Sequence, residues 1–167
     1  MKRISIILFL LGSSLYGISQ ESLIPQNYSL EKAEDYSKYE KEVVKCIEWL
    51  EATPLNEQEK LRDDVNTFVG KWINGSPTIT VELNANTSVY FKKNVELLPY
   101  FLCGWTKHML QHPEDNKDVV KGNLAGLRSV IRIYQKGIKV KKDKEIEKLI
   151  KLENDNKLEN WIRDQLK

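Results

Sequence analysis

The chain has 167 residues, and its 26 basic and 24 acidic residues leave a formal net charge of +2, which excludes polyanion binding through bulk charge. Hydrophobic residues make up 41% and charged residues 30%, a composition typical of a folded domain and not of a disordered chain. This length can bury one hydrophobic core and favours a single domain.

Residues 1–19 have the layout of a secretory signal peptide. Lys2 and Arg3 precede an apolar run over residues 4–11, and Gly17 and Ser19 place small residues where a signal peptidase reads the chain. The run is shorter than the roughly 20 residues of a permanent membrane span. We therefore expect cleavage after Ser19 and an exported protein, periplasmic or secreted, with no transmembrane segment after cleavage; the alternative is a buried N-terminal helix.

Helical periodicity begins after a flexible lead-in that we expect over residues 20–28. Apolar residues at three- and four-residue steps predict a helix over residues 29–52, which Thr53 and Pro54 end. Asn56 and Glu59 resemble a capping box and predict the start of a second helix, which Asn74 and Gly75 end.

Residues 78–92 have a different pattern. Ile79, Val81 and Leu83 alternate with polar residues, and Val89 and Phe91 alternate again after a polar turn. This two-residue period predicts a β-hairpin that packs on the helices; the alternative is a long extended connection.

The helical period returns in the second half of the chain. It predicts helices over residues 97–112 and 118–136 and two short helices over residues 144–152 and 157–166. In the helix over residues 118–136, one side carries mostly small residues: Gly122, Gly126, Ser129 and Ile133. This side would let another helix approach closely, and we expect the partner to be another helix of the same chain. The fold class is therefore mainly α: a single helical domain of about five to six helices over residues 20–167, with a β-hairpin insertion over residues 78–92.

His108 and His112 lie four residues apart on one predicted helix face, as two-histidine metal sites require. Glu114 and Asp115 could add oxygen ligands, and zinc would be the cofactor. Met109 stands where zinc peptidases carry their glutamate, so that motif is absent. The alternative interpretation is two packing histidines at a helix end, where a histidine also suits the helix dipole.

Basic residues form a stripe on the helix over residues 118–136. Nine Lys or Arg residues and two Asp residues lie between residues 116 and 144, and Lys121, Arg128, Arg132 and Lys136 share one face. This stripe could bind an anionic envelope component or a partner protein. No aromatic residues interleave with it, so nucleic acid is not an expected partner. The alternative is that the acidic first half of the chain lies against this basic second half.

Cys46 and Cys103 could pair in an oxidising compartment, or they could remain two buried thiols. Serine nucleophile elbows, phosphate loops, paired-cysteine zinc motifs and dinucleotide fingerprints are all absent from the sequence. The lack of a catalytic motif lowers the expectation of an enzyme.

The segments 68–77, 104–107 and 122–126 (FVGKWINGSP, GWTK and GNLAG), together with the signal that ends before Gln20, resemble small exported proteins of Bacteroidetes-type bacteria. The resemblance implies export and a helical fold but no activity. The leading hypothesis is a non-enzymatic binding or interaction module of the cell envelope. The alternatives are a metal-binding protein or metal-dependent hydrolase that uses His108 and His112, and a structural homo-oligomer built through the glycine-rich helix face.

Overall fold

The computed structural model describes residues 22–83 and 85–167, so the predicted signal peptide lies outside the described residues. The described chain is mainly helical, as expected. Its α-helices are α1 (Ala33–Lys38), α2 (Glu40–Ala52), α3 (Glu59–Gly75), α4 (Ala85–Ser88), α5 (Leu98–Gln111), α6 (Val119–Gln135), α7 (Lys144–Asn154) and α8 (Leu158–Gln165). Short 3-10 turns are η1 (Val89–Phe91), η2 (Val95–Leu97) and η3 (Pro113–Asp115).

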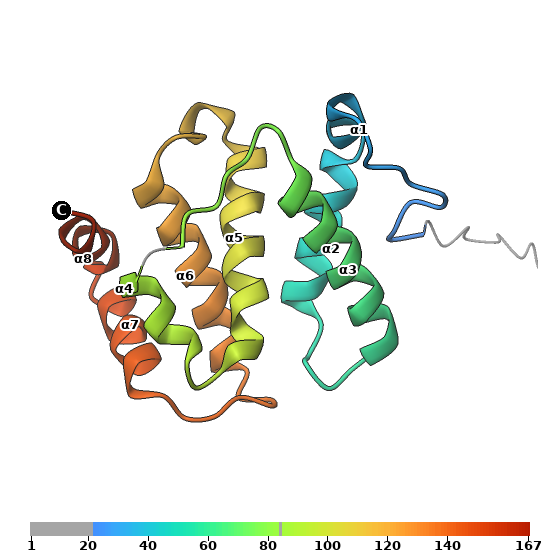
Figure 1. The fold of residues 1–167 in the computed structure, drawn as a ribbon. Helices are drawn as coiled ribbons and strands as arrows, with labels where there is room; N and C mark the ends of the chain where they lie inside the picture. The colour runs from blue at the N-terminus through green and yellow to red at the C-terminus, as the bar shows by residue number, and fades with distance from the viewer. Residues whose placement is uncertain (1–21, 84) are drawn as a thin grey trace, which may run out of the picture.

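The helices are arranged in three layers (Figure 1). Helices α5 and α6 form the centre, α1, α2 and α3 cover one side, and α7 and α8 cover the other. The core lies between these layers, where each helix turns its apolar face inward. None of the described helices combines the length and apolar character needed to cross a membrane.

The first layer differs in two details from the predicted helices. The helix predicted over residues 29–52 is divided at Tyr39, whose φ and ψ of −110° and 8° interrupt it between α1 and α2. Asn56 does not cap α3, because the helix begins only at Glu59, after Gln58 in the left-handed region with φ 49°. The predicted ends of α2 before Thr53 and of α3 at Gly75 are confirmed.

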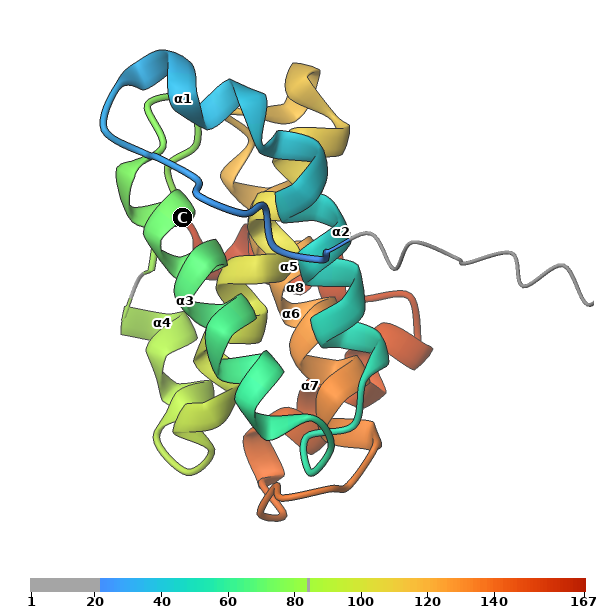
Figure 2. The ribbon, with the colours of Figure 1, turned by 90° about the vertical axis from the view of Figure 1, so that its right-hand side faces the viewer.

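Residues 22–30 run across α2 and α3 (Figure 2). The described part of the expected lead-in has turns but no helix or strand. The carbonyl oxygen of Leu23 nevertheless accepts a hydrogen bond from the Cys46 thiol at 3.3 Å, and the Tyr28 ring stacks edge-on against Phe68 with centroids 4.7 Å apart. These contacts attach the segment to the first layer.

Helices α5 and α6 approach so closely that three glycine positions at the contact have no room for a side chain. A Cβ on Gly104 would lie 2.6 Å from the carbonyl oxygen of Ala125, and one on Gly126 would lie 2.7 Å from the Phe101 ring. A Cβ on Gly122 would lie 2.3 Å from the Trp105 ring. The small-residue face of α6 is therefore filled by α5, which confirms the expected internal packing. A homo-oligomer could form through this face of α6 only if α5 moved away from it.

The predicted β-hairpin over residues 78–92 is wrong, since none of the residues described in the structure forms a strand. The chain up to residue 83 is irregular, and the later part coils into α4 and η1. The neighbours Tyr90 and Phe91 are both buried, which the two-residue period of a half-buried strand does not allow. A lone hairpin is marginal in water. Here the apolar side chains pack on helices instead, as when Phe91 meets Phe101 edge-on at 5.6 Å.

Candidate functional site

An open groove of about 710 Å³ lies along the junction of α5 and α6, and we name it the charged groove. Gly104, Leu124 and Ala125 line it where the two helices are in contact. The remaining lining side chains are charged or polar: Glu51, Lys107, His108, Gln111, His112, Glu114, Asp115, Lys121, Arg128, Arg132 and Glu159. Both sequence-predicted clusters, the histidines and the basic stripe, therefore contribute to one surface.

Helix α6 carries the predicted basic stripe and directs three of its four residues into the charged groove. Lys121, Arg128 and Arg132 line the groove, whereas Lys136 does not. Lys136 donates hydrogen bonds to the carbonyl oxygens of Glu51 and Ala52 at the end of α2. There its ammonium group compensates the negative end of the helix dipole. Lys136 thus binds the end of α2.

The three groove-lining cations of the stripe are each paired with a carboxylate. Lys121 Nζ lies 2.6 Å from Asp115 Oδ1, and Arg128 Nε lies 2.7 Å from Glu153 Oε1. Arg132 Nη2 lies 2.7 Å from Glu51 Oε1. Of these three partners only Glu51, on α2, belongs to the acidic first half of the chain, so the alternative interpretation of the stripe holds for Arg132 and not for Lys121 or Arg128.

Glu51 joins three helices at one end of the charged groove. Its carboxylate accepts hydrogen bonds from Ser129 Oγ at 2.6 Å and from Arg132 on α6, and it also pairs with Lys107 on α5. The Glu51 side chain is only 10% exposed. Sequence reasoning missed Glu51, although a signal was present: it follows Ile47 by four residues, so it lies beside the apolar stripe of α2.

Burial of Glu51 would raise the pKa of its carboxyl group, but the hydrogen bonds from Lys107, Ser129 and Arg132 outweigh burial and hold that pKa below its usual 4.5. A carboxyl group with a lowered pKa in the folded state stabilises the fold above its unfolded pKa. The contribution is lost as the pH falls through the folded value.

Acidification is therefore expected to remove the contribution of Glu51 to stability. The free energy of unfolding of the wild-type protein should exceed that of Glu51→Gln by a constant amount above pH 4.5, and the difference should shrink as the pH falls further. Urea unfolding at several pH values between 7 and 3 measures this difference. A difference that grows on acidification would contradict the assignment.

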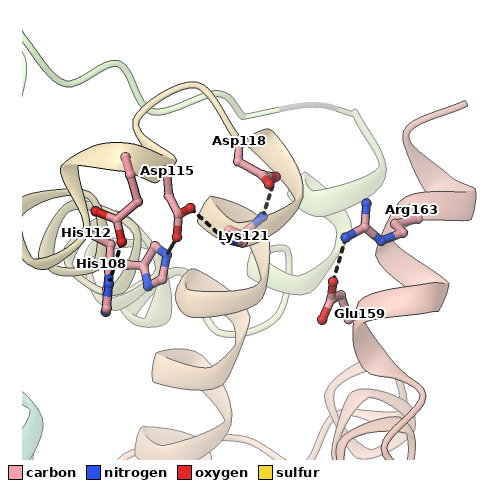
Figure 3. Close-up of polar contacts among 8 residues, drawn as sticks. His108, His112, Asp115, Asp118, Lys121, Glu159 and Arg163 are labelled. Atoms are coloured by element: carbon pink, nitrogen blue, oxygen red, sulfur yellow. Dashed lines mark hydrogen bonds and ion pairs between the residues drawn. The ribbon is translucent and has the colours of Figure 1, made fainter.

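Asp115 organises the opposite end of the charged groove. His108 Nε2 lies 2.9 Å from Asp115 Oδ2, and Lys121 contacts the other carboxylate oxygen (Figure 3). The hydrogen bond from Lys121 is the largest cause that holds the pKa of Asp115 below its usual 3.8, and His108 adds to it. Helices α5 and α6 thus hold this carboxylate between them, immediately after the turn that ends α5.

The two predicted metal-binding histidines lie side by side but contact different carboxylates. The ring centroids of His108 and His112 are 4.7 Å apart, with 32° between the ring planes. His108 faces Asp115, whereas His112 Nδ1 lies 3.3 Å from Glu114 Oε1. Among the described residues, the donor atoms that gather are those of His112, Glu114 and Asp115.

Cys46 and Cys103 are free, buried thiols, so the disulfide that the sequence left open is not formed. The Cys46 thiol donates its hydrogen bond to the carbonyl oxygen of Leu23. Burial raises the pKa of each thiol to about 12. Both cysteines therefore pack as small apolar residues, the other alternative for this pair.

No family model matches this sequence, and neither the curated proteins nor the solved structures gave a significant match. The resemblance to small exported proteins of Bacteroidetes-type bacteria stays a prediction from the sequence. Function is therefore inferred from the contacts, charges and shape of the charged groove.

Proposed function

We propose that this chain is a non-enzymatic binding module of the cell envelope and that the charged groove is its ligand site. A groove of about 710 Å³ has the size of a site for a small molecule or a short chain segment. It brings together side chains from α2, α5, α6, α8 and η3. Export, which residues 1–19 predict, would place this groove in the periplasm or outside the cell.

The proposal rests chiefly on Arg128 and Arg132. They lie one helical turn apart on the wall of the charged groove, and their side chains are 47% and 49% exposed. Each guanidinium group is anchored through one nitrogen, Nε of Arg128 by Glu153 and Nη2 of Arg132 by Glu51. The other N–H groups remain for a ligand, and a guanidinium fork matches the geometry of carboxylate and phosphate oxygens. The ligand class is therefore one that presents such an anionic group.

The lining of the charged groove supports binding over covalent catalysis. Among the described residues that line it there is no serine, threonine or cysteine, so His108 has no nucleophile beside it to activate. Ser129 hydrogen-bonds to Glu51 but is fully buried. The carboxylate of Glu51 is engaged by three donors and kept ionised. Such fixed groups suit recognition of charge.

Replacement of Arg128 by glutamine tests this proposal. We expect the wild-type protein to bind inorganic phosphate saturably, with amide chemical-shift changes gathered on α6 around Arg128 and Arg132. Arg128→Gln should weaken this binding about tenfold, the equivalent of one charge-assisted hydrogen bond. The measurement is a two-dimensional ¹H–¹⁵N titration with sodium phosphate at constant ionic strength.

The matched control is Lys60→Gln. Lys60 is 90% exposed and is paired with Asp64, and neither residue lines the charged groove. This variant should bind phosphate like the wild-type protein. Shifts that increase linearly and spread over all exposed cations, or equal losses in the two variants, would show that the groove has no specific anion site.

A further inference from the structure

The end of the charged groove nearest η3 carries a group of donor atoms that the proposed anion-binding function does not use. One ligand atom each from His112, Glu114 and Asp115 lie within 4.8 Å of one another. We propose that these three residues form a site for a divalent transition-metal ion of the Zn²⁺ class. The ligand set differs from the one that the histidine spacing indicates, because His108 is directed to Asp115 and not to the ion.

The donor types and their spacing fit such an ion. Zinc accepts imidazole nitrogen and carboxylate oxygen at about 2 Å, so two donors of a tetrahedral site lie about 3.3 Å apart. His112 Nδ1 and Glu114 Oε1 already lie 3.3 Å apart. In the metal-bound state the ion would replace the proton that this nitrogen and this carboxylate oxygen share.

The backbone holds the three donors in one short turn. Pro113 begins η3, and the amide of Asp115 donates a hydrogen bond to the carbonyl oxygen of His112 at 2.9 Å. Because the ligands span four consecutive residues, little chain entropy is lost when they close on an ion. His112 and Glu114 are exposed, which leaves an entry path and room for water ligands.

Asp115 is oriented before any ion arrives. His108 holds one of its carboxylate oxygens, and the residue is only 9% exposed, whereas Lys121 occupies the other oxygen. Each carboxylate oxygen has a second lone pair that can bind a metal. Lys121 also places a positive charge beside the site, so its ammonium group competes with the ion. Glu114 and Asp118 lie near enough to act on the Lys121 charge, and together with Asp115 they leave this end of the groove negative.

Because Lys121 competes with the ion, its replacement should raise the zinc affinity, and a non-specific interaction would not produce such an increase. Isothermal titration of ZnCl₂ into the untagged chain, purified without chelator, should show one site per chain. His112→Asn and Glu114→Gln should each weaken the affinity more than about tenfold, because each removes a direct ligand. Lys121→Gln should tighten it severalfold. Glu57→Gln, which removes an exposed carboxylate in another turn, should leave it unchanged.

Three results would overturn the metal site: no zinc binding up to millimolar concentration, undiminished binding in both His112→Asn and Glu114→Gln, or weaker binding in Lys121→Gln. The side chains of all four substituted residues are at least partly exposed: His112, Glu114, Lys121 and Glu57. The variants should therefore remain folded, and far-ultraviolet circular dichroism checks this. The outcome is independent of anion binding, because Arg128→Gln should bind zinc like the wild-type protein.

Discussion

Replacement of Glu51 by glutamine is expected to lower the free energy of unfolding by about 3 kcal/mol. The substitution keeps the size of the side chain but removes the charge that Lys107 and Arg132 contact. Lys107 is only 19% exposed, so its ammonium group would remain partly desolvated without a counter-charge. Arg132 is 49% exposed, so water would compensate for most of the ion pair that it loses. Urea unfolding at pH 7 measures the change.

Two further variants identify the cause of that loss. Glu59 forms a surface pair with Lys139, and both side chains are more than half exposed, so Glu59→Gln should leave stability unchanged within error. The double variant Glu51→Gln/Lys107→Met should regain part of the stability, because it removes the unpaired charge as well. A double variant that is less stable than Glu51→Gln would show that Lys107 contributes by packing and not by charge.

Replacement of Gly104 by alanine is expected to destabilise the protein by about 2 kcal/mol, even though alanine is the better helix former. The new methyl group would lie 2.6 Å from both the carbonyl oxygen of Ala125 and the Cβ of Ser129. Neither atom belongs to the far end of a flexible side chain. The two helices would therefore have to separate, and the contacts between α5 and α6 would be lost over several turns. Urea unfolding measures this effect as well.

Replacement of Gly70 by alanine is expected to stabilise the protein instead. Gly70 lies within α3, and a Cβ there would meet no atom within 4 Å. Gly70→Ala should stabilise the protein by about 1 kcal/mol, the difference in helix propensity between the two residues. If both alanine variants were stabilised, the contact between α5 and α6 would be looser than the structure has it.

The helices could be predicted because each carries enough apolar residues at helical spacing to mark its buried face. Helix α6 is the clearest case. The sequence predicts a helix over residues 118–136 and a small-residue side, and the structure has α6 at Val119–Gln135 with Gly122 and Gly126 against α5. The segment around Ile79 and Leu83 gave a false signal, because alternation describes a strand only when a partner strand exists.

The site could be predicted only in part. The basic stripe and the histidines are visible in the sequence because each lies within a single helix. Their partners are not visible, because Glu51 is about 80 residues away from Arg132 along the chain. The orientation of His108 likewise depends on Asp115, which the turn after α5 brings back toward it. Pairing across helices is a property of the tertiary fold, and local periodicity carries no information on it.

The residues that pack α5 against α6 differ from the exposed residues that line the charged groove. Gly104 lies at the base of the charged groove, where it is buried against α6. Exposed lining residues such as Gln111 and Arg128 lie outside that contact. Under the proposed function, substitutions at these exposed positions would alter ligand preference while the helix pair beneath them stays the same. New specificities would then arise on this chain without a new fold.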